Sequence, residues 1–291
     1  MYVRCHSGLG NQLYQYAAAT ELARRRDAQV LVLAAQPIEL LVDALGAEHV
    51  EEPRQRADPR IPAVFGTGRS GWAATRAFAR ATGRLSTAIF QVPDQHYDPP
   101  SRAVERLAAM KRPVLLHGYF QHPAYGGQSI GTVAQLLLDR RTAFGRRSGV
   151  IGAHVRRGDY LSHGWELSEE FYKRALSRID PDRLCSVLIA SDDELAARWL
   201  NSQFSKLGWA SDIISTPTNS PADDLCELAM CQHFIASNST LSAWAAFAGD
   251  HLWRGSARTV AVPDPWLPPT DVPVPVRPNW VSVQRNVPDD S

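Results

Sequence analysis

The sequence predicts an α/β protein built on parallel sheets. Short apolar segments suited to buried strands alternate with amphipathic segments of helical period along most of the chain. The segments of strand character are 29–34, 114–117, 149–155, 186–190, 234–237 and 259–262. Those of helical character include 12–26, 169–178 and 193–200. Because such alternation is typical of β-α-β units, successive strands are expected to lie parallel.

The length favours two domains. Domains usually hold about 100 to 200 residues, and this chain has 291. A basic, turn-rich stretch at 140–148 separates two series of alternating segments, so we expect an N-terminal domain over 1–146 and a C-terminal domain over 147–291. The stretch 54–84 is poorly patterned, and the proline-rich tail after Pro263 is expected to wrap the surface in extended form.

Composition excludes several classes of function. The 31 Lys and Arg residues and 30 Asp and Glu residues are interspersed, which argues against nucleic acid as a partner. The four cysteines form no CxxC pair, which argues against a zinc site. The N-terminus lacks the pattern of a signal peptide, and no run approaches about 18 apolar residues. We expect a cytoplasmic protein without a transmembrane segment, with peripheral contact at the inner membrane left open.

The first candidate binding motif is GLGNQ at 8–12, between a short opening strand and a helix. Main-chain amides at the start of a helix attract anions, so Gly10, Asn11 and Gln12 are candidate donor-binding residues. A dinucleotide fingerprint would need a third glycine where Leu13 stands, which argues against a hydride-transfer enzyme. The alternative is a plain turn whose glycines supply positive φ.

The second motif is HVRRGDY at 154–160, directly after a predicted strand. Because side chains alternate along a strand, His154 and Arg156 are expected to point the same way. Ligands of open α/β sheets bind at the carboxyl ends of strands, and the arginine fork suits a diphosphate. The alternative is a charged turn that only caps the strand.

Two acidic pairs follow predicted strands or open helices. For SDD at 191–193 the sequence favours a helix cap, with a metal site or a hydrogen bond in the donor site as alternatives. Asp224, at the start of a helical stretch, is either an N-cap or a binding residue. NSTLS at 238–242 follows another strand, and the amides of Ser239 and Thr240 are expected to form a second anion cradle.

Together these blocks resemble the α-1,2-fucosyltransferases of glycosyltransferase family eleven, bacterial type. The family's GLGNQLFQYA, GYxQ, HxRRGDY, SDD and NS[S/T]FSWW stand here at 8–17, 118–121, 154–160, 191–193 and 238–244, in the same order. Tyr14, Leu241 and Ala243 depart from the family pattern. Leu241 and Ala243 are expected to change the packing near the donor-binding turn, and they leave the identity of the acceptor undetermined.

The resemblance implies a GT-B-type architecture, with two Rossmann-like domains facing a cleft. It implies inverting transfer of L-fucose from GDP-β-L-fucose to a sugar hydroxyl, with no metal or other cofactor. The acceptor expected from the family is the 2-hydroxyl of a terminal galactose in a glycan or oligosaccharide. The rival hypotheses are a non-catalytic module that binds a GDP-sugar or glycan, and a GT-B glycosyltransferase with another donor.

The resemblance also assigns roles to residues. Arg156 would hold the β-phosphate as the main catalytic group, His154 and Asp224 would contact the guanine nucleotide, and Asn11 would lie at the sugar diphosphate. The full expected donor-binding set is Gly10, Asn11, Gln12, His154, Arg156, Asp193, Asp224, Asn238, Ser239 and Thr240. For the general base the sequence offers Asp159 and His117 and does not choose between them.

Overall fold

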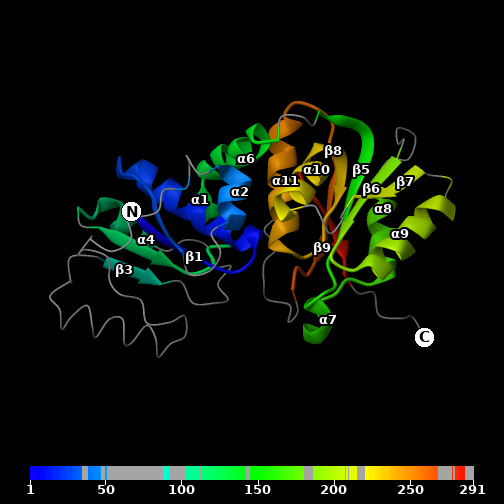
Figure 1. Ribbon diagram of the computed structural model, residues 1–291, viewed down its shortest axis with the longest axis horizontal. Helices are drawn as coiled ribbons and strands as arrows, with labels where there is room; N and C mark the ends of the chain where they lie inside the picture. Colours follow the sequence, from blue (N-terminus) through cyan, green and yellow to red (C-terminus); the bar gives the residue numbers. More distant parts are fainter. Residues whose placement is uncertain are drawn as a thin grey trace. The chain divides into compact units, whose positions relative to one another are not determined.

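The computed structural model describes residues 1–34, 39–46, 50, 88–91, 102–111, 113–141, 145–179, 186–206, 208, 210–214, 220–267, 277 and 279–285. They form two compact units, Met1–Ser129 and Ile130–Ser291 (Figure 1). The sequence-based boundary after residue 146 lies farther along the chain, beyond the helix at 129–139. The poorly patterned stretch 54–84 falls outside the described residues.

The N-terminal unit is a parallel α/β sheet in the strand order β2-β1-β4-β3. Its elements are β1 (Tyr2–Cys5), α1 (Leu9–Arg25), β2 (Leu31–Ala34), α2 (Glu39–Leu45), β3 (Ala88–Gln91), α4 (Arg102–Ala109), β4 (Val114–His117) and α5 (Pro123–Gly126). The two central strands, β1 and β4, are buried along their whole length, as their apolar sequences predict.

The C-terminal unit contains a six-stranded parallel sheet in the order β10-β9-β8-β5-β6-β7. Its elements are α6 (Ser129–Asp139), β5 (Arg147–Val155), α7 (Tyr160–His163), α8 (Glu169–Leu176), β6 (Ser186–Ser191), α9 (Glu194–Lys206), β7 (Ala210–Ile213), α10 (Pro221–Met230), β8 (Cys231–Ile235), α11 (Thr240–Leu252), β9 (Val260–Asp264) and β10 (Val281–Gln284).

The order of this sheet determines where a ligand can bind. From β5 the chain builds outward through β6 and β7, and then returns to place β8 on the other side of β5. Neighbouring strands whose connections leave in opposite directions open a crevice at their carboxyl ends. The crevice of this unit is therefore expected after β5 and β8.

Most predicted strands are confirmed, but two predictions are wrong. The helix expected from residue 12 begins at Leu9, because Gly8 is its N-cap and Gly10 lies in its first turn. The tail does not simply wrap the surface, because Val281–Gln284 pairs in parallel with β9 as the sixth strand. Valines at 281 and 283 favour a strand there, and the prolines that dominate the tail lie before it.

A buried charged cluster holds this last part of the chain against α11. Asp250, near the end of α11, accepts hydrogen bonds from Arg258 Nε at 3.2 Å and from Trp280 Nε1 at 2.8 Å. The Arg258 and Asp250 side chains are only 4% and 6% exposed. Arg258 also donates to the main-chain oxygen of Cys231 at 2.5 Å. The cluster therefore joins α11, the start of β8 and the segments around β9 and β10.

Candidate functional site

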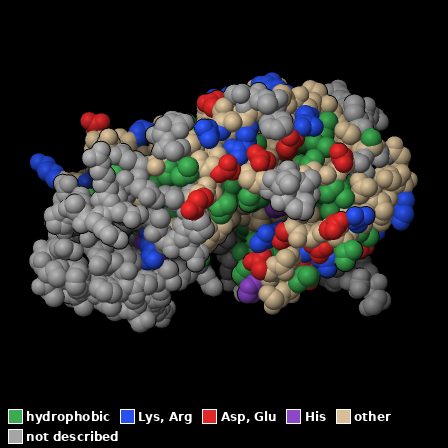
Figure 2. Space-filling view, viewed as in Figure 1, with side chains coloured by type: hydrophobic (Ala, Val, Ile, Leu, Met, Phe, Trp, Pro, Cys, Tyr) green, Lys and Arg blue, Asp and Glu red, His purple; other side chains and the backbone are tan. Residues whose placement is uncertain are grey.

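Three of the sequence motifs meet at the carboxyl edge of the C-terminal sheet. HVRRGDY begins with the last two residues of β5, SDD begins with the last residue of β6, and NSTLS follows β8. The register places Val155 beside Ser191 and Ala153 beside Ile235, so the three strands end together. Figure 2 shows charged side chains of both signs gathered around α7, which follows β5. The motifs separated in sequence thus converge at the predicted crevice.

Arg156 is held by two carboxylates at this edge. Its Nη2 lies 2.5 Å from Asp159 Oδ1, and its Nη1 lies 2.8 Å from Asp192 Oδ2. Its guanidinium carbon lies 5.4 Å from the centre of the Tyr160 ring, within range of a cation–π contact. The Arg156 side chain is 35% exposed, so it is both oriented and accessible to a ligand.

Asp192 fixes the loop that carries Arg156 and does not cap a helix. Its Oδ1 accepts the main-chain N–H of Arg157 at 2.8 Å. A Cβ on Gly158 would lie 2.5 Å from Asp192 Oδ2, so a larger residue at 158 would have to displace this carboxylate. The glycine of the motif therefore leaves room for Asp192 beside Arg156.

Asp193 is the residue that caps α9. Its Oδ1 accepts the N–H of Ala196 at 3.1 Å, and its Oδ2 lies 3.6 Å from Arg157 Nε. The favoured prediction of a helix cap in SDD is thus correct for Asp193 alone. The expected donor-binding role of Asp193 competes with these two contacts, because both of its oxygens are already engaged.

His154 is buried in a cluster of serines at the switch between β5 and β8. Its Nδ1 lies 2.6 Å from Ser242 Oγ, 3.0 Å from Ser237 Oγ and 3.5 Å from Ser239 Oγ. Burial, and secondarily the charge of Arg156, lowers the pKa of His154 to about 3. The imidazole is therefore neutral at pH 7 and joins the end of β5 to the start of α11.

The start of α11 provides main-chain donors next to this cluster. Ser239 is the N-cap, and its Oγ accepts the N–H of Ser242 at 3.1 Å. Within the described part of the chain, the N–H groups of Thr240 and Leu241 donate to no other group. These amides, beside a buried neutral histidine, have the geometry of an anion site.

Asn238 links this turn to the loop after α7. It is 1% exposed, and its Nδ2 donates to the carbonyl of Trp165 at 2.7 Å. Its own carbonyl accepts from the Tyr160 hydroxyl at 3.3 Å. Among the described residues its buried Oδ1 has no hydrogen-bond partner.

Asp224 is not an N-cap. Ser220 caps α10, and the neighbouring Asp223 completes a reciprocal capping box with it. Asp223 also forms a 2.8 Å ion pair with Arg141. Asp224 lies in the first turn of α10 but does not cap the helix, so the N-cap alternative for this residue is wrong.

The GLGNQ motif of the N-terminal unit forms the turn between β1 and α1. Gly8 has φ −67°, and the positive φ belongs to Ser7 at 68°, so the glycine alternative based on positive φ is wrong at Gly8. Gln12 is buried and donates to the Ser7 carbonyl at 2.8 Å. Asn11 accepts from Gln121 at 2.7 Å, which brings the first two sequence blocks together.

Other polar side chains surround this turn, among them His117, one of the two candidate general bases. The Ser7 hydroxyl lies 3.1 Å from His6 Nδ1 and 3.3 Å from the Tyr119 hydroxyl. His117 ends β4 and is 2% exposed. Burial, followed by the charges of His6 and Arg4, lowers its pKa to about 4. His117 is therefore neutral at pH 7 and weakly basic. This low basicity makes it a poorer candidate for the general base.

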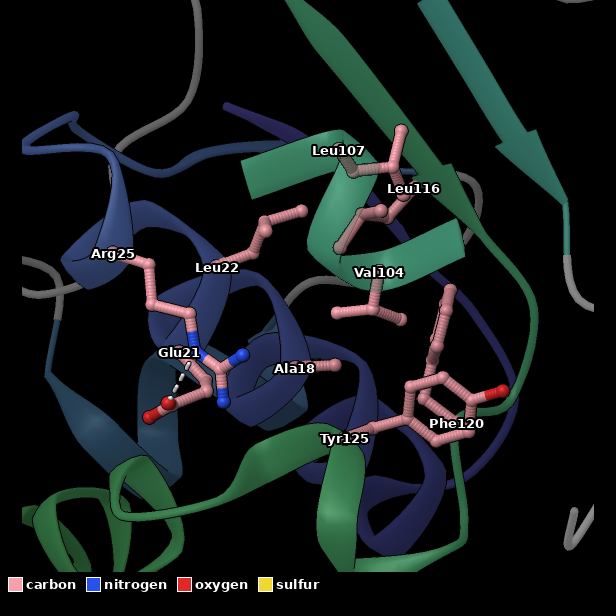
Figure 3. Close-up of a pocket in the computed structure, with 9 residues that line it drawn as sticks. All are labelled: Ala18, Glu21, Leu22, Arg25, Val104, Leu107, Leu116, Phe120 and Tyr125. Atoms are coloured by element: carbon pink, nitrogen blue, oxygen red, sulfur yellow. Dashed lines mark hydrogen bonds and ion pairs between the residues drawn. The ribbon is translucent and has the colours of Figure 1, made fainter. Parts of the chain in front are cut away.

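A small, mostly apolar pocket in the N-terminal unit lies away from this turn. The residues that line it are Ala18, Glu21, Leu22, Arg25, Val104, Leu107, Leu116, Phe120 and Tyr125 (Figure 3). Glu21 is eleven residues beyond Gly10 on α1, which corresponds to about 16 Å along the helix axis. The Glu21 carboxylate accepts from Arg24, Arg25 and Ser129, so it stabilises the fold locally.

Among the helices of the described residues, none combines the length and the apolar character of a membrane span. Across the same ranges, no three His, Cys, Asp or Glu side chains are grouped so that they could hold a metal ion.

Comparison with known proteins identifies the family. The model of glycosyl transferase family 11 matches residues 109–260, over half of the chain. A comparison with curated protein sequences gives no match. POFUT1 in complex with GDP is 13% identical, with a TM-score of 0.50, covering 90% of this chain and 97% of its own. A mutant FUT1 of Arabidopsis thaliana in complex with GDP is 12% identical, with a TM-score of 0.53, covering 92% and 72%.

These similarities agree with the architecture described above. The two parallel α/β sheets are shared with the fucosyltransferase structures, which confirms the predicted GT-B-type fold class. The family match contains the motifs at 118–121, 154–160, 191–193 and 238–244. The chain belongs to glycosyl transferase family 11, a family of fucosyltransferases.

Proposed function

We propose that this protein transfers L-fucose from GDP-β-L-fucose to the 2-hydroxyl of a terminal galactose, with inversion at the anomeric carbon. The observation that carries the proposal is the placement of Arg156 and the start of α11 at one edge of the C-terminal sheet. An oriented guanidinium and main-chain amides together suit a diphosphate. The solved relatives POFUT1 and FUT1, each in complex with GDP, support a guanosine diphosphate as the ligand.

Charge on the leaving group is the basis of the proposed mechanism. The acceptor hydroxyl oxygen bonds to the anomeric carbon of fucose from the face opposite GDP, and its proton passes to a general base. As the bond between that carbon and the β-phosphate oxygen breaks, negative charge grows on GDP and positive charge on the sugar. Arg156 and the main-chain amides at the start of α11, Thr240 among them, stabilise the growing negative charge without requiring a cation. The proposal therefore includes no metal and no further cofactor.

Other residues are assigned to the donor by family resemblance. We propose that Asp224 accepts hydrogen bonds from the guanine base and that Asn11 meets the sugar diphosphate. His154 serves the same site chiefly through its serine cluster, since its Nδ1 is already engaged there. Gly10 supports the Asn11 turn, and Gln12 holds that turn from within. The cytoplasm is the compartment we propose.

An acceptor screen tests the transfer itself. The purified protein and GDP-fucose are incubated with lactose, N-acetyllactosamine, free galactose and glucosides, and products are analysed by mass spectrometry and NMR. We expect fucose in α-linkage at the galactose 2-hydroxyl and no product with glucosides. A fucosylated product at another hydroxyl would contradict the proposed linkage. Binding of GDP-fucose without any transfer would favour the non-catalytic module.

A further inference from the structure

The charges around Arg156 present a difficulty for donor binding. In the described structure the guanidinium already faces two carboxylates, Asp159 and Asp192, at 2.5 and 2.8 Å. A diphosphate that binds the Arg156 guanidinium is attracted by its positive charge but repelled by the carboxylates of Asp159 and Asp192. Because the two carboxylates face both Nη atoms of Arg156, a diphosphate that binds across these two nitrogens must displace one carboxylate.

We infer that Asp159 is an exchangeable counter-ion that occupies the place of the donor's diphosphate on Arg156, while Asp192 remains in place as its anchor. This inference rests on the proposed function, because it takes GDP as the ligand of Arg156. The two carboxylates differ in burial, in their partners and in their attachment to the fold. Each difference favours Asp159 as the carboxylate that leaves and Asp192 as the one that stays.

Asp192 is fixed from several directions. Besides its contact with Arg156, its carboxylate accepts the N–H of Arg157 at 2.8 Å and lies close against Gly158. Its side chain is 25% exposed. It also follows directly from the end of β6, a strand that is buried at four of its six positions. Loss of its contact with Arg156 would leave the other contacts in place.

Asp159 has none of this support. Its side chain is 59% exposed, and in the described part of the chain Arg156 is the only hydrogen-bonded partner of its carboxylate. Its main-chain carbonyl accepts from the Ser162 hydroxyl at 2.7 Å, so the backbone can stay while the side chain rotates away. Exposed ion pairs of this kind are weak, whereas phosphate binds a guanidinium strongly.

The exchange has a measurable consequence for GDP binding. A carboxylate that must be displaced competes with GDP, so its removal should strengthen binding. Since exposed ion pairs contribute little, Asp159→Ala should lower the Kd for GDP by about two- to fivefold and lower the donor KM in parallel. A residue with a purely structural role would lower stability without tightening GDP binding.

Asp192→Asn should act in the opposite direction. The amide oxygen can still accept the Arg157 N–H, but an NH₂ group replaces the oxygen that faces Arg156. We expect the fork to lose its orientation, so that GDP binds more weakly and kcat falls by about tenfold or more. The melting temperature should change little, because the acceptor for the loop is retained.

Isothermal titration with GDP, steady-state kinetics and melting curves test the inference on the full-length protein. Glu194→Gln is the matched control, since it removes one carboxylate from an exposed 2.5 Å pair with Arg198 and should leave the Kd unchanged. Tighter binding by Asp159→Ala alone supports the exchange. Unchanged or weaker GDP binding by Asp159→Ala, or tighter binding by Asp192→Asn, overturns it. Arg156→Ala distinguishes a failure of the exchange hypothesis from a failure of the proposed donor site. Wild-type GDP affinity in that variant would refute the donor site itself.

Discussion

Arg156→Ala is expected to lower turnover by about two orders of magnitude or more while the protein stays folded. The guanidinium meets charge that grows as the fucosyl bond breaks, so its loss should harm kcat more than ground-state binding. Removal of a single preorganised donor from such a site commonly costs about 3 to 4 kcal/mol at the transition state. Steady-state kinetics together with GDP titration and melting curves give the comparison.

Two variants serve as controls for this result. Arg156→Lys should restore only part of the turnover, because an ammonium cannot reproduce the planar fork. Arg157→Ala should retain most of the turnover, since Arg157 pairs with the helix cap Asp193 at 3.6 Å and does not share the contacts of Arg156. A soluble, folded Arg156→Ala protein with near-normal turnover would contradict the mechanism.

Asp250→Ala is expected to lower the free energy of unfolding by about 3 to 5 kcal/mol. The substitution leaves Arg258, whose side chain is 4% exposed, as a buried cation without its carboxylate partner, and it removes the acceptor of Trp280 Nε1. Urea unfolding followed by tryptophan fluorescence measures the change. The control Glu194→Ala removes an exposed ion pair and should cost about 1 kcal/mol or less. Equal effects from both variants would refute the structural role of Asp250.

Much of the fold could be predicted because its strands are short apolar runs between turns. The strand 114–117 was predicted with its exact bounds, and Ser186–Ser191 differs from its prediction by one residue. The start of α1 was misjudged because glycine usually disfavours helices, whereas here Gly10 lies in the first turn. β10 was missed because pairing with β9 comes from tertiary contacts, which local composition does not reveal.

The candidate site could be located from sequence, but the role of each side chain could not. The carboxyl-edge rule correctly brought together the motifs at the ends of β5, β6 and β8. The sequence could not decide which aspartate of SDD caps α9, because adjacent carboxylates compete for one helix end. The sequence does not predict the serine cluster around His154, since Ser242 lies 88 residues farther along the chain and meets this side chain only in the folded protein.

The most direct test of the central claim is a donor comparison with one galactoside acceptor. Nucleotide release is measured for GDP-fucose, GDP-mannose, UDP-galactose and ADP-glucose, each with and without excess EDTA. We predict acceptor-dependent release of GDP from GDP-fucose, at a rate that EDTA does not change, and little release from the other donors. Preferred use of another nucleotide sugar, or complete loss of release with EDTA and its recovery with magnesium or manganese, would contradict this account.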